Sequence, residues 1–86
     1  MEKEFHFIPK GVCSREMIVH YEGDTITGLQ VIGGCNGNLK GIGALLVGMK
    51  FDEAITRLSG IKCGFKDTSC PDQIAMALKA IKENKE

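Results

Sequence analysis

Four cysteines in 86 residues constrain this chain more than any other feature. They stand at Cys13, Cys35, Cys63 and Cys70. Residues 1–4 (MEKE) are charged and lack the apolar stretch of a secretory signal, so we expect a cytoplasmic protein. A reducing cytoplasm disfavours structural disulfides. A set of four thiols therefore indicates metal binding or redox activity.

The charge balance argues against a nucleic-acid partner. Lys and Arg together number 11, Asp and Glu also number 11, and the pI is about 6.7. Proteins that bind nucleic acid electrostatically usually present a basic stripe and a high pI. Because the chain also lacks an apolar run near the roughly 18 residues that span a bilayer, we expect no membrane partner.

The length and the apolar fraction of 43% predict one small globular domain over residues 1–86. A homodimer is compatible with so small a core, although no sequence feature specifies one.

The first half of the chain predicts three strands. They cover residues 4–8, 17–21 and 25–32, and a turn centred near Gly23 joins the second strand to the third. The apolar positions of the third strand change parity around Gly28, which indicates a bulge. Short connections between consecutive strands are typical of an antiparallel meander.

The second half predicts three helices, at about residues 39–48, 52–59 and 70–82. Ser69 and Asp72 have the spacing of a capping box, and Pro71 falls in the first turn, where proline is tolerated. Strands followed by helices define an α+β class, with one sheet covered on one face.

The predicted hairpin brings two cysteines to one end of the sheet. With the turn centred near Gly23, Cys13 lies opposite Gly33 or Gly34, within two residues of Cys35. Cross-strand neighbours in such a pair are about 4.5–8 Å apart, so both thiols can ligate one centre.

The other two cysteines are expected at the same place. Cys35 precedes one predicted helix and Cys70 begins another, and a helix N-terminus stabilises a thiolate. Cys63 stands in the loop before the last helix and can fold back toward Cys70. The alternative is that these thiols simply fill space in a core, as free cysteines often do.

Three other groups of residues are weaker candidates for a site. Residues 33–38 (GGCNGN) are compatible with a phosphate cradle but match neither GxxxxGK[ST] nor GxGxxG followed by an acidic residue. His6 and His20 lie in predicted strands and are expected to be packed or solvated rather than ligands. A mild basic rim near the cysteines, or simply a solvated surface, is expected of Lys40, Lys50, Lys62 and Lys66.

The pentapeptide TSCPD at residues 68–72 resembles the TSCPD domain family, which takes its name from these letters. The likeness extends over residues 33–38 and Cys63–Gly64, and the chain looks like the four-cysteine, stand-alone branch. Related domains stand at the C-terminus of cobalamin-dependent ribonucleoside-diphosphate reductases. The resemblance therefore implies a link to ribonucleotide reduction and DNA synthesis, and a partner that is a redox or reductase-related protein.

The order of elements is also similar to U-type iron–sulfur cluster scaffold proteins. In those proteins one cysteine opens a hairpin, one closes it after a glycine and a third starts the final helix, which corresponds here to Cys13, Cys35 and Cys70. Residues 48–54 (GMKFDEA) resemble the scaffold's middle segment. The chain departs from the scaffolds at Arg15 and Ser69, where they carry aspartate and histidine, and it lacks their Leu-Pro-Pro-Val-Lys motif.

The Leu-Pro-Pro-Val-Lys motif of the scaffolds, their chaperone motif, is absent from residues 61–66, and Cys63 stands in this stretch instead. The chain thus has an all-cysteine set of Cys13, Cys35, Cys63 and Cys70. Four thiolates suit an iron–sulfur cluster or Zn²⁺. We therefore expect a small metal-binding protein, with an iron–sulfur cluster as its cofactor, that acts as a cluster carrier or an electron-transfer accessory. The alternatives are a thiol-redox accessory in which Cys63 and Cys70 cycle with a disulfide, and a structural zinc module.

No independent catalytic activity is visible in the sequence. It contains no acid–base pair or Cys–His arrangement that can be assigned without a structure. A chain of 86 residues also has no room for the barrel, radical cysteine and cobalamin site of a reductase. A reductase name for this chain would rest on family transfer alone.

Overall fold

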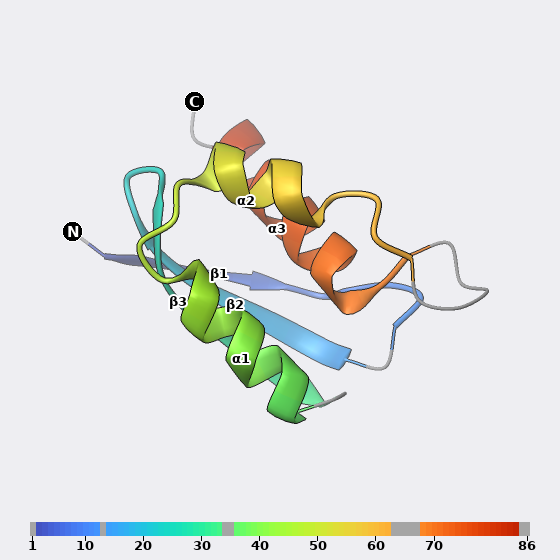
Figure 1. The fold of residues 1–86 in the computed structure, drawn as a ribbon. Coiled ribbons are helices and arrows are strands. Elements are labelled where there is room, and N and C mark those ends of the chain that lie inside the picture. Colours follow the sequence, from blue (N-terminus) through green and yellow to red (C-terminus); the bar gives the residue numbers. More distant parts are fainter. Residues whose placement is uncertain (1, 13, 34–35, 63–67, 85–86) are drawn as a thin grey trace.

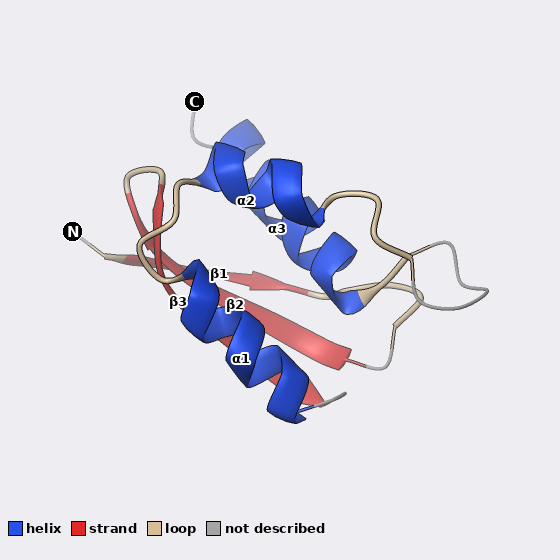
Figure 2. Cartoon of the chain, viewed as in Figure 1, coloured by secondary structure: helices blue, strands red, loops and turns tan. Residues whose placement is uncertain are grey.

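A three-stranded sheet covered by helices on one face forms the fold (Figure 1; Figure 2). The computed structural model describes residues 2–12, 14–33, 36–62 and 68–84, with the backbone alone for 36–38 and 84. The elements are β1 (Lys3–Phe7), β2 (Ser14–Glu22), β3 (Thr25–Gly33), α1 (Asn36–Leu46), α2 (Phe51–Leu58) and α3 (Cys70–Asn84). The predicted α+β class, a meander followed by three helices, is confirmed.

The β2–β3 hairpin sets the register of the sheet. Its loop is the pair Gly23–Asp24, and Glu22 pairs with Thr25. Gly23 has φ +63°, the left-handed region favoured at the first position of a II′ loop. The loop has two residues rather than the three of a turn centred on Gly23, so the pairing of residues 16–22 differs by one residue from the predicted register. A second shift between Ser14 and Glu16 removes this difference, and the pairing of Ser14 with Gly33 agrees with the predicted register at that end of the hairpin.

The bulge predicted around Gly28 is confirmed. Tyr21 pairs with Ile26 and His20 pairs with Gly28, so Thr27 is the extra residue of β3. This residue restores the inward orientation of the apolar positions that follow it.

The core lies between the sheet and the helices. Met17 and Val19 of β2 are fully buried in it. Tyr21 packs on Phe51 of α2 with the rings tilted by 59° and their centroids 5.5 Å apart. The buried residues of the central cluster are Met17, Val19, Ile26, Leu46, Phe51, Ala54, Ile74, Ala77, Leu78 and Ile81. None of the helices in the described part of the chain has both the length and the apolar character needed to cross a lipid bilayer.

The connection between α1 and α2 is fixed to the edge of β3. The Ile26 amide donates to the Met49 carbonyl at 2.9 Å, and the Gly48 amide donates to the Ile26 carbonyl at 2.7 Å. These bonds hold α1 over β3 while α2 and α3 cover the rest of the sheet (Figure 1).

Two helices begin at the same end of the sheet. Figure 1 shows that α1 and α3 both start near the end at which β2 begins and β3 ends, here called the site end. The hairpin loop Gly23–Asp24 lies at the opposite end. Two helix N-termini at one end give it a positive local potential.

A side chain added at either of two glycines should change the stability of the protein, and in opposite directions. A Cβ at Gly41 of α1 would meet nothing within 4 Å, so Gly41→Ala should stabilise the chain by about 0.5–1 kcal/mol through helix propensity. Gly33 has φ +83°, and a Cβ there would lie 3.3 Å from the Arg15 amide nitrogen. Gly33→Ala should therefore cost about 1–2 kcal/mol. Urea unfolding of both variants checks this, and effects of the same sign would contradict it.

The open face of the sheet holds a histidine between two glutamates. His6 Nδ1 lies 2.7 Å from a Glu16 carboxylate oxygen, and His6 Nε2 lies 2.7 Å from Glu4. The hydrogen bond to Glu16 and then that to Glu4 raise the pKa of His6 above 6.5. Both histidines face solvent in part, and His20 Nδ1 lies 3.9 Å from Glu4.

A histidine titration tests this arrangement of His6 between Glu4 and Glu16. Because the folded pKa of His6 is raised, its stabilising effect should be complete below pH 6.5 and disappear as the pH rises through the folded value. NMR titration should give His6 a pKa above 6.5, and Glu16→Gln should lower it more than Glu4→Gln. A His6 pKa at or below 6.5 in the parent chain would rule out these two hydrogen bonds to Glu4 and Glu16.

Candidate metal centre

The pentapeptide at residues 68–72 forms the start of α3. The Ser69 hydroxyl accepts a hydrogen bond from the Asp72 amide at 3.2 Å and donates one to the Ile61 carbonyl at 2.6 Å. Ser69 therefore caps the helix as predicted, with Pro71 in the first turn. The helix begins at Cys70, directly after this cap.

Asp72 does not complete the predicted capping box. Its carboxylate accepts instead from the Gly60 amide at 2.7 Å and from the Thr68 hydroxyl at 2.5 Å. The Thr68 hydroxyl, then the Gly60 amide and finally the charge of Lys79 lower the pKa of the buried Asp72, although desolvation opposes them. Asp72 thus holds both ends of the segment between Gly60 and Thr68 at the start of α3.

Gln73 joins the β1–β2 loop to the same place. Its side-chain oxygen accepts from the Lys10 amide at 3.1 Å, and its side-chain nitrogen donates to the Thr68 hydroxyl at 2.9 Å. Gly11 packs so closely that a Cβ there would lie 3.1 Å from the Thr68 methyl carbon. The loop that leads to Cys13 is therefore held against the pentapeptide.

Cys70 contacts the beginning of β2. Its Sγ lies 3.0 Å from the Ser14 hydroxyl oxygen, and its side chain is partly buried against the core. Ser14 in turn pairs with Gly33 across the sheet. Ser14 follows Cys13 directly and Gly33 stands two residues before Cys35, so the chain neighbours of both cysteines meet beside Cys70.

Of the four predicted ligands, Cys70 is the one whose position the structure describes. Cys13, Cys35 and Cys63 lie outside the described residues. Within residues 2–12, 14–33, 36–62 and 68–84, no three His, Cys, Asp or Glu side chains are arranged to hold a metal ion.

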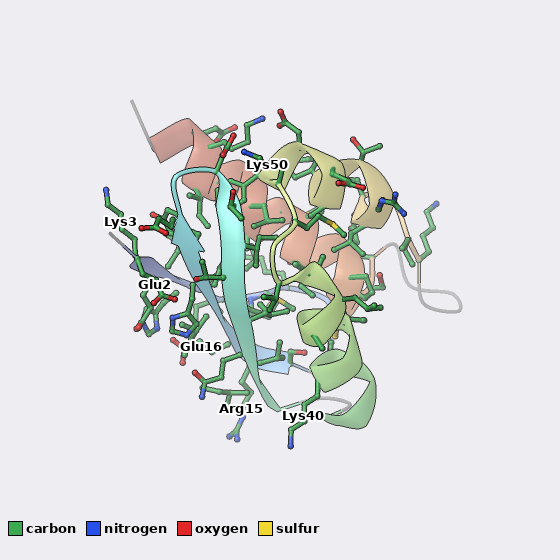
Figure 3. All side chains as sticks on the ribbon, turned by 60° about the vertical axis from the view of Figure 1, so that its left-hand side comes forward. Glu2, Lys3, Arg15, Glu16, Lys40 and Lys50 are labelled. Atoms are coloured by element: carbon green, nitrogen blue, oxygen red, sulfur yellow. The ribbon has the colours of Figure 1, made fainter. Side chains whose placement is uncertain are left out.

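The predicted basic rim is only partly correct. Figure 3 shows Arg15 and Lys40 at the site end, and Lys50 at the far end beside the hairpin loop. There the Lys50 ammonium lies 3.4 Å from the Asp24 carboxylate. Lys50 is therefore not part of a rim near the site end, because α1 carries the chain from that end to the hairpin loop. Lys40, Lys50 and Lys62 are all exposed, which agrees with the alternative of a solvated surface, and Lys66 lies outside the described residues. Arg15, which sequence reasoning did not include, has its side chain against Gly33.

Sequence reasoning also missed Ser14 and Gln73. Nothing in their spacing marks them, since Gln73 meets Lys10 across 63 residues of chain and Ser14 meets Cys70 across 56. The position of Ser14 directly after Cys13 was the one available signal.

The fold and the site define a small α+β domain with a cysteine at the capped start of its last helix and a hydrogen-bonded pentapeptide around it. The family model of the TSCPD domain matches residues 2–82, and the chain belongs to this family. Searches of curated proteins and of solved structures give no match to the chain. The likeness to U-type scaffolds therefore rests on the sequence alone: the order of elements, the cysteine positions and residues 48–54.

Proposed function

We propose that Cys13, Cys35, Cys63 and Cys70 ligate one metal centre, and that this centre is an iron–sulfur cluster. The observation that supports this most is the position of Ser14, which pairs with Gly33 and contacts the Cys70 sulfur. One residue thus links the neighbourhoods of three cysteines. The fourth, Cys63, stands three residues after Gly60, which Asp72 holds at the start of α3.

The surroundings fit a thiolate-bound centre. Four thiolates around a cluster or a divalent ion leave a net negative charge, which nearby positive charge stabilises. The site end offers the N-termini of α1 and α3 and the side chains of Arg15 and Lys40 (Figure 3). The Ser14 hydroxyl adds a hydrogen bond to one ligand sulfur.

An all-cysteine ligand set favours retention over delivery. U-type scaffolds, as described above, carry aspartate and histidine at positions where this chain has Arg15 and Ser69. The Ser69 hydroxyl caps α3, donates to the Ile61 carbonyl and accepts from the Asp72 amide, so it does not replace a histidine ligand. We infer that the protein keeps its cluster and acts as an electron-transfer accessory rather than as a carrier that hands the cluster on, with a redox or ribonucleotide-reductase-related protein as its partner.

Anaerobic purification from cells, followed by a visible spectrum and analysis of iron, sulfide and zinc on one sample, tests this function. A brown protein with broad absorbance and matching iron and sulfide is expected. Stoichiometric zinc without colour would replace the cluster by a structural zinc site. A metal-free protein whose thiols oxidise reversibly would overturn the metal centre in favour of a thiol-redox accessory.

A further inference from the structure

Ser14 is a buried polar residue whose hydroxyl meets a sulfur atom. Residue Ser14 is 5% exposed, and its hydroxyl oxygen lies 3.0 Å from the Cys70 Sγ. Placing a hydroxyl in a protein interior is unfavourable unless it forms a hydrogen bond. Here the bond is made to the thiol at the start of α3.

A bulge turns Ser14 toward that thiol. Met17 and Val19 are fully buried, so strict alternation along β2 would bury Arg15 and expose Ser14. The pairing of β2 with β3 shifts between Ser14 and Glu16, which makes Arg15 the extra residue. The burial is accordingly reversed, with Ser14 buried and Arg15 exposed. Bulges re-aim side chains in this way, often beside functional sites.

The chemistry of a ligated cysteine fixes the direction of the hydrogen bond. A thiol and a hydroxyl can each donate to the other, but a metal-bound thiolate has no proton and accepts alone. Once Cys70 is a ligand, the Ser14 hydroxyl must therefore donate to it. Donors to ligand sulfurs tune metal centres, and outer partners of this kind orient the ligands they contact.

We propose that Ser14 is the positioning residue of Cys70: its hydroxyl donates a hydrogen bond that orients the sulfur and stabilises it as the thiolate ligand. This inference rests on the proposed metal centre for its role, while the contact itself is independent of any metal. The bulge at Arg15 is then a device that delivers the hydroxyl to the sulfur.

Two pairs of side chains at position 14 test the hydroxyl, and the threonine–valine pair, which is isosteric, separates it from packing. The first pair compares the parent with Ser14→Ala, which lacks the hydroxyl. The second pair compares Ser14→Thr with Ser14→Val, which have the same shape and differ in the hydroxyl. The second pair keeps the test valid if alanine unfolds the strand. The probe is Co²⁺, added anaerobically to the full-length apo-protein, because its thiolate charge-transfer band reports on the ligand sulfurs.

Both hydroxyl-free variants should bind Co²⁺ about 10–100-fold more weakly than their hydroxyl-bearing partners. Their charge-transfer band should also move to longer wavelength, because a sulfur without a donor holds its electrons less tightly. A purely structural role would weaken binding without moving the band. Equal affinities and equal bands within both pairs would overturn the proposal.

A metal-free measurement distinguishes failure of the proposal from failure of the proposed function. With Cys13, Cys35 and Cys63 replaced by serine, a double-mutant cycle of Ser14→Ala and Cys70→Ala, followed by urea unfolding, measures the coupling between the two side chains without metal. The effects of the two substitutions should be non-additive, because residues in direct contact are coupled. If the parent binds no Co²⁺ and the two effects are still coupled, the metal centre is wrong and the Ser14–Cys70 contact stands. Additive effects would overturn the contact itself.

Discussion

Replacing Cys13 by serine should weaken metal binding by more than about 100-fold, because losing an outer partner of a ligand already costs about 10–100-fold and this change removes a ligand. Anaerobic competition between the apo-protein and a chelator for Zn²⁺ measures the affinity, and iron content after purification from cells reports the loss in vivo. The same loss is expected for Cys35→Ser, Cys63→Ser and Cys70→Ser.

The four single variants serve as controls for one another. A shared centre predicts that all four fail alike, because each removes one of four equivalent ligands. A Cys63–Cys70 disulfide shuttle predicts instead that Cys13→Ser and Cys35→Ser keep reversible thiol oxidation. An affinity for Zn²⁺ that survives in Cys13→Ser would contradict the shared centre.

Asp72→Ala should destabilise the apo-protein by about 2–4 kcal/mol, because it removes two hydrogen bonds to a buried carboxylate and leaves the Gly60 amide without that partner. For a domain of this size, that corresponds to a fall in Tm of at least roughly 10 °C. Metal affinity should fall with it, because Asp72 holds both ends of the segment that contains Cys63. Thermal unfolding followed by circular dichroism measures the first effect.

Asp52→Ala is the matched control. Asp52 also lies in the first turn of a helix, but it is 80% exposed and forms an ion pair with Lys82 at the surface. Such pairs contribute about 0–1 kcal/mol, so this variant should remain close to the parent. Equal destabilisation by the two alanine variants would refute the role assigned to Asp72.

The stabilising effect of Asp72 should be lost at low pH. Its folded pKa is lowered from 3.8, so the effect is complete above that value and is lost as the pH falls through the folded pKa. The stability difference between the parent and Asp72→Asn should therefore narrow below about pH 3.8.

The elements could be predicted because their signals are local. The capped start of α3 depends on residues 69–72, and the bulge of β3 appears as a change of parity around Gly28. The pairing of residues 16–22 was missed by one residue because a two-residue and a three-residue loop around Gly23 leave nearly the same pattern of apolar residues. A glycine with positive φ fits both.

The site was less predictable because its contacts are long-range. Cysteine spacing indicated that Cys13 and Cys35 share one end of the sheet, and the pairing of Ser14 with Gly33 agrees with that for their neighbours. The bulge at Arg15, which turns Ser14 inward, has no sequence signature, since Arg15 is compatible with either face until the pairing is known. The second role of Asp72 was hidden for the same reason, because Gly60 is twelve residues away.

X-ray absorption at the edge of the metal that the protein retains after anaerobic purification tests the central claim most directly. A single centre held by Cys13, Cys35, Cys63 and Cys70 predicts a first shell made of sulfur alone, with four sulfurs at about 2.3 Å if the metal is zinc. An iron–sulfur cluster adds neighbouring iron atoms beyond that shell. A first shell that contains nitrogen or oxygen ligands would contradict an all-cysteine centre.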